Sequence, residues 1–196
     1  QEVWVDLYKD WYRFLFVNSE TFDVDFYTNY IHYLKLYSEQ NWLTQFFQNN
    51  DSEIKKKLAI IQSDPSSFED EIFSYGTKKF KYSKTAFFDR AKYIRESFDK
   101  EEYIHAYPIK RKKDRMILEI ENIGFYTVQI DRVSVDDEVT QVNEILIPHA
   151  SNELPEFKNF EFKCPINHGD IIIDYHIIGD NETRQTKAFK WKRKVE

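Results

Sequence analysis

The chain has 196 residues, of which 41% are hydrophobic and 17% aromatic, so it is long and apolar enough to bury a substantial core. Its formal net charge of -6 at pH 7 argues against a nucleic-acid-binding domain held by phosphate contacts. The single cysteine, Cys164, excludes an intramolecular disulfide.

Neither a membrane span nor a secretory signal peptide is visible in the sequence. No apolar run approaches the roughly 20 residues that cross a bilayer, so we expect no transmembrane segment in this chain. The first residue is Gln, and we therefore expect a processed chain or a fragment whose targeting or anchoring signal is missing.

The first part of the chain, to about residue 98, has the periodicity of helices. The stretch "VWVDLYKDWYRFLF" predicts a helix over 3–16. The stretch "DVDFYTNYIHYLKLY" predicts another over 23–37. The two expected buried stripes are Trp4, Leu7, Trp11 and Leu15, and then Phe26, Tyr30, Tyr33, Leu34 and Tyr37.

Three further helical patterns follow. Ser38 is predicted to cap "EQNWLTQFFQNN", and Asp51 or Ser52 to cap "EIKKKLAIIQ", which Pro65 prevents from continuing. The stretch "KTAFFDRAKYIRESF" predicts a helix over 84–98. The apolar residues expected on inward faces are Trp42, Leu43, Phe46 and Phe47, then Ile54, Leu58 and Ile61, and finally Phe87, Ala91, Ile94 and Phe98.

The period changes to two after Tyr103, which predicts strands. In "RMILEIEN" the residues Met116, Leu118 and Ile120 alternate with Glu119 and Glu121. The preceding stretch "YIHAYPI" alternates weakly, and residues 122–124 have turn chemistry.

The next strand, "FYTVQIDRVSV", carries its own irregularity. Its expected inward residues are Tyr126, Val128 and Ile130, then Val133 and Val135. The inward parity slips between Ile130 and Val133, and an extra residue near Asp131 would cause this slip. We therefore predict a β-bulge near Asp131.

Further strand candidates are "EILIPH", "FKNFEFKC", "DIIIDYHIIG" and "TKAFKWKRK", with "GDNET" as a hairpin loop between the last two. Short strands without intervening helices predict an antiparallel sandwich. The predicted fold class is therefore α+β, with a helical segment over 1–100 and an immunoglobulin-like antiparallel β-sandwich over 101–196.

The search for metal-binding and nucleophilic residues leads to His149, Cys164 and His168 on or near expected loops. A structural zinc site normally has four ligands in two close pairs, and the second pair is missing here. A thiolate nucleophile would need an oriented base, and nothing in the sequence orients one. We favour a buried or incidental cysteine and expect no metal or other cofactor.

Two acidic clusters and the absence of nucleotide-binding and hydrolase motifs bear on whether the chain is an enzyme. Paired carboxylates can process glycosides, but the consecutive acids of residues 69–71 and 136–138 would point apart and more often form a solvated face. The clusters are Glu69, Asp70 and Glu71, and Asp136, Asp137 and Glu138. No nucleotide-loop or GxSxG pattern occurs, so we expect no enzymatic activity in this chain.

Two basic runs are the cationic features of the sequence. They are "KRKKDR" at 110–115 and "KWKRK" at 190–194, and they lie near the aromatic residues Tyr107, Phe189 and Trp191. Such runs can bind anionic polymers. Because the domain is acidic overall, we favour a solvated hairpin tip and a lysine-protected edge strand, and we expect no nucleic-acid partner. Residues 181–183 match a glycosylation sequon, which has no meaning in a bacterial protein.

Four stretches are informative together. They are "FYTNYIHYLKLYSEQNWLTQFF", "KYIRESFDKEEYIHAY" and "ILEIENIGFYTVQIDRV", which span most of residues 20–135, and "DYHIIG" at 174–179. These stretches resemble the region that follows the kinase-like domain in large bacterial envelope proteins of the CotH-like (spore coat protein H-like) group. In that family the catalytic machinery would lie upstream, so no active-site residue carries over. The resemblance implies an extracytoplasmic, envelope location and an accessory role.

The expected function is therefore a non-catalytic interaction or spacer module of a larger bacterial cell-envelope protein. Its partners would be neighbouring domains of the same protein or another protein. The alternative is a carbohydrate-binding or glycoside-processing unit that uses exposed aromatic residues and the acidic clusters. A concave aromatic surface with convergent carboxylates would favour the alternative.

Overall fold

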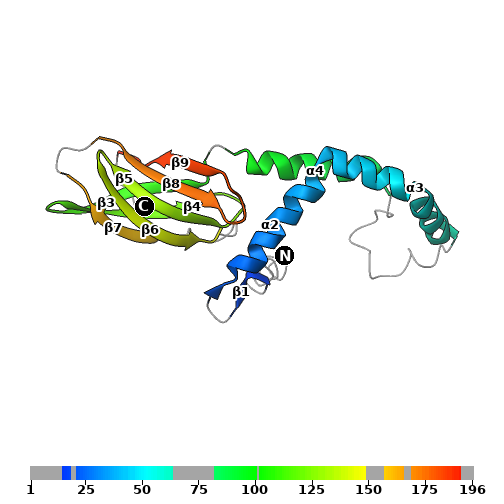
Figure 1. Ribbon diagram of the computed structural model, residues 1–196, viewed down its shortest axis with the longest axis horizontal. Coiled ribbons are helices and arrows are strands. Elements are labelled where there is room, and N and C mark those ends of the chain that lie inside the picture. The colour runs from blue at the N-terminus through cyan, green and yellow to red at the C-terminus, as the bar shows by residue number, and fades with distance from the viewer. Residues whose placement is uncertain are drawn as a thin grey trace, which may run out of the picture. The chain divides into compact units, whose positions relative to one another are not determined.

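The computed structural model describes residues 15–18, 21–63, 82–100, 102–148, 157–165 and 169–190. They form an α+β structure in which helices precede a sandwich of antiparallel strands, as predicted (Figure 1). The described residues divide into a sandwich unit, which holds those up to His32 and from Lys100 onward, and a helical unit of residues 33–99. This grouping differs from the predicted division at residue 100, because the residues up to His32 group with the sandwich.

The N-terminal part of the described chain contains a short ladder and a helix. Strands β1 (Val17–Asn18) and β2 (Thr21–Phe22) pair antiparallel, and helix α2 (Val24–Ser38) follows. The helix begins where Asp23 accepts a hydrogen bond from the Phe26 nitrogen at 2.9 Å. The expected helix over 3–16 lies outside the described residues except for its last two, of which Phe16 and not Leu15 is buried.

The stripe predicted to be buried on α2 is wrong. Four of its five residues are exposed, namely Phe26, Tyr30, Tyr33 and Tyr37, and Leu34 is half-buried. Tyr27 and Ile31 are instead completely buried. The buried stripe is thus displaced by one residue. Aromatic residues occupy two adjacent stripes of this helix, and apolar spacing alone does not show which stripe meets a partner.

Both predicted N-caps within the next helical stretch are wrong. Helix α3 runs without interruption over Gln40–Ser63 and ends two residues before Pro65. Ser38 belongs to α2, where its hydroxyl donates to the Lys35 carbonyl at 2.8 Å and its own carbonyl accepts from Arg95. Asp51 pairs with Lys55 on the exposed surface of α3 at 2.7 Å, so it stabilises this helix instead of starting another.

Helix α4 (Lys84–Phe98) confirms the predicted range and is capped by Ser83, whose hydroxyl oxygen accepts from the Ala86 nitrogen at 3.3 Å. Ala91 and Phe98 are buried, as predicted. The core between α3 and α4 contains Leu43, Phe47 and Ala91. Phe87 was expected in this core, but it is 52% exposed.

The described strands of the sandwich form two sheets (Figure 1). One has the order β3-β4-β7, and the other has the order β6-β5-β8-β9. This is the immunoglobulin arrangement in which strands A, B and E face strands C, F and G, with an additional strand C′ beside C. The bounds are β3 (Ile104–Lys112), β4 (Arg115–Asn122), β5 (Val128–Val135), β6 (Glu138–Leu146), β7 (Lys158–Lys163), β8 (Ile171–Ile177) and β9 (Thr183–Lys187).

The inward faces of β4 and β5 confirm the predicted core. Every residue expected to point inward on these two strands is buried. The register of β5 shifts between Ile130 and Arg132 against both neighbours, which confirms the β-bulge at Asp131. Turn chemistry after β4 is also confirmed, since the side-chain Oδ1 of Asn122 accepts a hydrogen bond from the Gly124 nitrogen at 2.8 Å.

The two edge strands of the four-stranded sheet differ most from their predicted ranges. Strand β6 begins at Glu138, six residues before the expected start at Glu144, and β9 ends at Lys187 within the range expected for the last strand. Leu146 is the one fully buried residue of β6, and β9 has none. Their weak apolar alternation explains why the sequence places them poorly.

Beyond β9 the chain passes from one sheet to the other. The Ala188 nitrogen donates to the Ile171 carbonyl of β8 at 2.9 Å. The Phe189 nitrogen donates to the Ala106 carbonyl of β3, also at 2.9 Å. Consecutive residues therefore bond to different sheets.

Candidate functional site

Aromatic rings form a continuous series along the helical unit. The ring centroids of Tyr33 and Tyr37 are 5.6 Å apart, those of Tyr37 and Trp42 are 4.6 Å apart, and those of Trp42 and Phe46 are 5.3 Å apart. The series continues through Phe47 to Phe87, with centroid distances of 5.4 and 5.5 Å. We call this set the aromatic ladder: Tyr33, Tyr37, Trp42, Phe46, Phe47 and Phe87.

Most of the aromatic ladder is exposed, although one ring belongs to the core. Tyr33 and Tyr37 are each 49% exposed, Phe46 is 40% exposed and Phe87 is 52% exposed. Phe47 is only 4% exposed and packs with Leu43 and Ala91. The exposed rings are therefore attached to the packed interior of the helical unit through Phe47.

The local sequence explains this arrangement. Residues four positions apart are neighbours on a helix, which brings Tyr33 beside Tyr37 and Trp42 beside Phe46. In α3 the apolar residues come in adjacent pairs, Trp42 with Leu43 and Phe46 with Phe47. The second residue of each pair is buried in the core. The first lies about 100° around the helix from it, at the margin between the core and solvent.

The polar residues beside the aromatic ladder are uncharged. Residues 40–50, "QNWLTQFFQNN", contain no acidic or basic side chain. The Thr44 hydroxyl donates to the Gln40 carbonyl and the Asn50 amide donates to the Phe46 carbonyl, each at 2.8 Å. Because these side chains already have a hydrogen-bond partner, covering them costs less free energy than covering unpaired polar groups.

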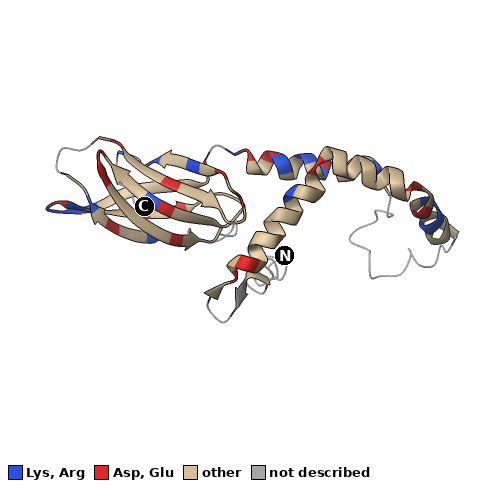
Figure 2. Ribbon diagram, viewed as in Figure 1, with Lys and Arg blue, Asp and Glu red and all other residues tan. Residues whose placement is uncertain are grey.

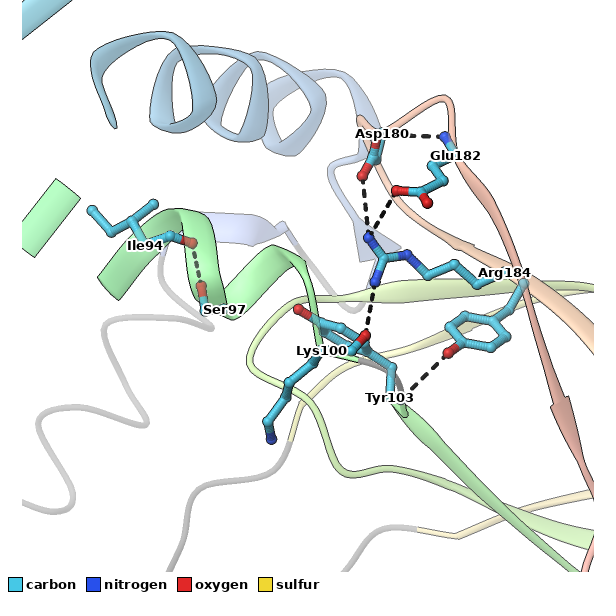
Figure 3. A network of polar contacts seen from close by, with 8 residues as sticks. Ile94, Ser97, Lys100, Tyr103, Asp180, Glu182 and Arg184 are labelled. Atoms are coloured by element: carbon cyan, nitrogen blue, oxygen red, sulfur yellow. Dashed lines mark hydrogen bonds and ion pairs between the residues drawn. The ribbon is translucent and has the colours of Figure 1, made fainter. Parts of the chain in front are cut away.

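A polar network lies at one end of the sandwich unit (Figure 3). The Arg184 guanidinium donates to the Lys100 carbonyl and to the Glu182 carboxylate, each at 3.2 Å, and lies 3.7 Å from the Asp180 carboxylate. It also lies 5.2 Å from the centre of the Tyr103 ring. Because only 11% of the Arg184 side chain is exposed, this network stabilises the sandwich and offers little surface to a ligand.

Burial shifts the acidity of two tyrosines in the same region. It raises the pKa of Tyr103 far above its ordinary value, although the nearby Arg184 charge acts in the opposite direction. Burial also raises the pKa of Tyr175, whose hydroxyl accepts a hydrogen bond from the Tyr103 nitrogen at 3.3 Å. Both phenols are therefore held in the neutral form.

The residues singled out as metal ligands are only partly described. His149 and His168 lie outside the described residues. Cys164 is completely buried, as favoured from the sequence, and Arg111 donates to its carbonyl at 3.1 Å and to its sulfur at 3.3 Å. Within the described ranges, no three His, Cys, Asp or Glu side chains gather where they could hold a metal ion.

The acidic cluster at 136–138 lies at the turn between β5 and β6. Asp136 accepts a hydrogen bond from the Gly169 nitrogen at 3.1 Å, and Glu138 pairs with Lys163 at 2.5 Å. These acids thus take part in contacts within the sandwich. The other cluster, Glu69, Asp70 and Glu71, lies outside the described residues.

The basic run at 110–115 lies at the end of the β3–β4 hairpin (Figure 2). The predicted hairpin is confirmed, but its tip is shorter than the six polar residues expected. Lys112 pairs with Arg115, so only Lys113 and Asp114 form the reversal, and Lys113 has a positive φ of 50°. Of the second run only Lys190 is described, and Asn181 of the sequon is exposed between β8 and β9.

Sequence reasoning missed two polar contacts between β5 and β8. Asp131 lies at the bulge and meets His176 at 2.9 Å, and the adjacent Arg132 pairs with Asp174, whose side chain is 3% exposed. The predicted bulge was the one sign of these contacts in the sequence. Because β5 has an extra residue there, the consecutive residues Asp131 and Arg132 both contact β8. Both contacts join the two central strands of the four-stranded sheet.

No protein-family model matches the chain, and no curated protein matches it. The resemblance to CotH-like envelope proteins therefore stays a prediction. None of the helices in the described ranges combines the length and the apolar character needed to cross a bilayer.

Proposed function

We propose that this chain is a non-catalytic interaction module of a larger bacterial cell-envelope protein, and that its helical unit binds a partner protein through the aromatic ladder. The observation that carries the proposal is the series of contacting rings, four of which are at least 40% exposed. The envelope location is supported by the resemblance of residues 20–135 to CotH-like proteins.

The composition of this surface is typical of the centre of a protein–protein interface. Such centres are enriched in aromatic residues and depleted of charge, and a few aromatic anchors there carry most of the binding energy. The aromatic ladder lies beside the uncharged residues 40–50. A contiguous exposed apolar surface is costly to keep in water, so a partner that covers these rings gains free energy from their burial.

Helices present these anchors in a way that suits a groove on the partner. The exposed members Tyr33 and Tyr37 are one helical turn apart, as are Trp42 and Phe46. Peptide-binding grooves commonly read apolar side chains at this spacing. The partner we propose is therefore a protein with an apolar, weakly charged groove.

Carbohydrate binding is the second candidate for the same surface. Aromatic rings can stack against sugar rings, and the amide side chains of residues 40–50 can hydrogen-bond to hydroxyl groups. The acidic cluster at 136–138 does not add support, because Asp136 and Glu138 are engaged within the sandwich.

The test compares the unmodified chain with a variant that carries Tyr37→Ser, Phe46→Ser and Phe87→Ser. Each chain is immobilised, incubated with envelope extract and with an oligosaccharide array, and its bound material is quantified. We expect the unmodified chain to retain one protein. The affinity of the variant for that protein should be at least about tenfold lower, which corresponds to about 1.4 kcal/mol of binding free energy. Circular dichroism checks that both chains are folded.

The matched control is Phe125→Ser, which removes an equally exposed ring, 52% exposed, from the sandwich unit. It should retain the partner. Protein capture that survives the triple substitution would refute the proposal. Ladder-dependent binding to the oligosaccharide array alone would replace it with the second candidate.

A further inference from the structure

Two strands that, among the described strands, have a neighbour on one side only come together at one edge of the sandwich. Strand β3 is the last strand of the three-stranded sheet, and β9 is the last strand of the four-stranded sheet. The hydrogen bond from Phe189 to Ala106 joins these edges at one point. A cleft of about 830 Å³ extends from this point between Ile104 and His105 on one wall and Gln185, Thr186 and Lys187 on the other.

Two small residues line the cleft, Thr186 of β9 and Ala188 just beyond it. Thr186 lies opposite the fully buried Ile173, so it occupies a position that faces the core. Ala188 follows two residues later and bonds to Ile171. Both side chains are small and leave room for the cleft that they line together with Ile104.

The backbone along both walls is oriented for pairing with another strand. Ala188 bonds directly to Ile171, and antiparallel pairs alternate, so Gln185 and Lys187 direct their N–H and C=O groups away from β8. The same alternation, counted from the bond between Ile123 and Tyr103, directs the backbone groups of Ile104 away from β4. Among the described strands none occupies this edge of β9.

The charge at the cleft favours an acidic ligand near Lys190. The ammonium groups of Lys187 and Lys190 both pair with one carboxylate, that of Asp170, at 2.8 and 3.2 Å. Two positive charges therefore share one negative charge. Glu102, the acidic residue of the opposite wall, lies 3.8 Å from His105.

We infer that the cleft accepts an extended, acidic segment of a partner polypeptide, which adds as a strand to the edge of β9. Its backbone would pair with Gln185 and Lys187, an apolar side chain would enter the cleft toward Ile104 and Phe189, and a carboxylate would meet Lys190. A second copy of β9 is a poor occupant, because it would bring another Lys187 to an edge where positive charge is already in excess. This site is in the sandwich unit and does not depend on the aromatic ladder.

The test uses an eight-residue peptide of alternating Val and Glu, and a matched peptide with Lys in place of Glu. Binding to the full chain is followed by fluorescence anisotropy. We expect the Glu peptide to bind with a Kd below about 1 mM and at least about tenfold more tightly than the Lys peptide. Hydrogen exchange on the unmodified chain should show new protection at the Gln185 and Lys187 amides.

Two variants separate backbone pairing from charge. Gln185→Pro removes an outward N–H without removing a bond to β8, and it should weaken the Glu peptide at least about tenfold, whereas Gln185→Ala should not. Lys187→Gln with Lys190→Gln should abolish the preference for Glu over Lys. Equal binding of the two peptides, unchanged binding by a folded Gln185→Pro chain, or no new protection at Gln185 and Lys187 would each overturn the inference.

Discussion

The Tyr27 hydroxyl oxygen accepts a hydrogen bond from the Thr127 backbone nitrogen at 2.9 Å, although the two residues are 100 positions apart in the chain. Both residues are completely buried. A second contact lies close by, because Ile31 and Thr28 approach within 3.0 Å of the position that a Cβ atom on Gly179 would take. Gly179 has a φ of 87°, so glycine is required there for both the backbone conformation and the close approach.

The substitution Tyr27→Phe should remove this hydrogen bond without changing the packing of the ring. Because the Thr127 N–H is then buried without this acceptor, the free energy of unfolding should fall by about 1 to 3 kcal/mol in urea denaturation. The matched control is Tyr37→Phe, whose ring is 49% exposed, and its effect should stay within about 0.5 kcal/mol. Equal effects of the two substitutions would contradict the assignment.

Ile120→Asp tests the core of the sandwich. Ile120 is completely buried on β4, so the substitution places an unpaired charge in an apolar interior, and we expect a loss of at least about 3 kcal/mol or failure to fold. Val139→Asp introduces the same charge at a β6 residue that is 54% exposed and should change stability by less than about 1 kcal/mol. Denaturation curves of both variants provide the comparison. A loss below about 0.5 kcal/mol for Ile120→Asp would show that this side chain is not in the core.

The basic hairpin tip should divide into three dispensable lysines and one structural arginine. Gln substitutions at Lys110, Lys112 and Lys113 together should shift stability by less than about 1 kcal/mol, because exposed charges contribute little. Arg111→Gln should cost about 1 to 3 kcal/mol, since the guanidinium donates to the Cys164 and Pro165 carbonyls, each at 3.1 Å. Thermal unfolding measures both. A larger loss from the lysines than from Arg111 would contradict these roles.

The same lysines should not contribute to nucleic-acid binding. We expect no measurable affinity of the full chain for duplex or single-stranded nucleic acid near physiological salt. Micromolar affinity that falls steeply with salt and disappears in the triple-lysine variant would show phosphate contacts at the tip.

The buried Tyr103 phenol should make the free energy of unfolding depend on pH in the alkaline range. Burial raises its pKa in the folded state above the unfolded value of 10.0, so its contribution is fully present below that pH and is lost as the pH rises through the folded-state pKa. Tyr103→Phe should therefore reduce the decline in the free energy of unfolding above about pH 10. Urea titrations at a series of pH values measure this slope. An identical slope in the variant would contradict the burial of a neutral phenol.

Strands β4 and β5 were predictable because their apolar residues alternate along the chain and all pack in the core, although Glu121 on the other face of β4 is buried as well. On β4, Met116, Leu118 and Ile120 alternate with glutamates, which predicts the strand and its core-facing residues. On β5, the apolar alternation shifts by one residue at Asp131, which predicts the bulge. The stripe on α2 was not predictable, since Tyr27 and Tyr30 are both aromatic and only the sandwich selects Tyr27 for burial. Local spacing therefore determines the type of element more reliably than its buried face.

The two candidate surfaces left different traces in the sequence. The aromatic ladder could have been suspected from paired aromatic residues in the uncharged stretch 40–50, but exposure of Tyr37 and Phe46 depends on which neighbours pack against them. The cleft left no local signal. Ile104 and Lys187 lie far apart in the sequence, and only the order of strands within the two sheets brings their walls together.

The passage of the chain between the sheets has a mechanical consequence. Because the Ala188 and Phe189 nitrogens donate to Ile171 and Ala106 in different sheets, a force that pulls on Phe189 loads both sheets within one residue. Under such a force the hydrogen bonds to β8 and to β3 would bear the load together. In a spacer that transmits force between domains, this attachment would distribute the load at the point of entry.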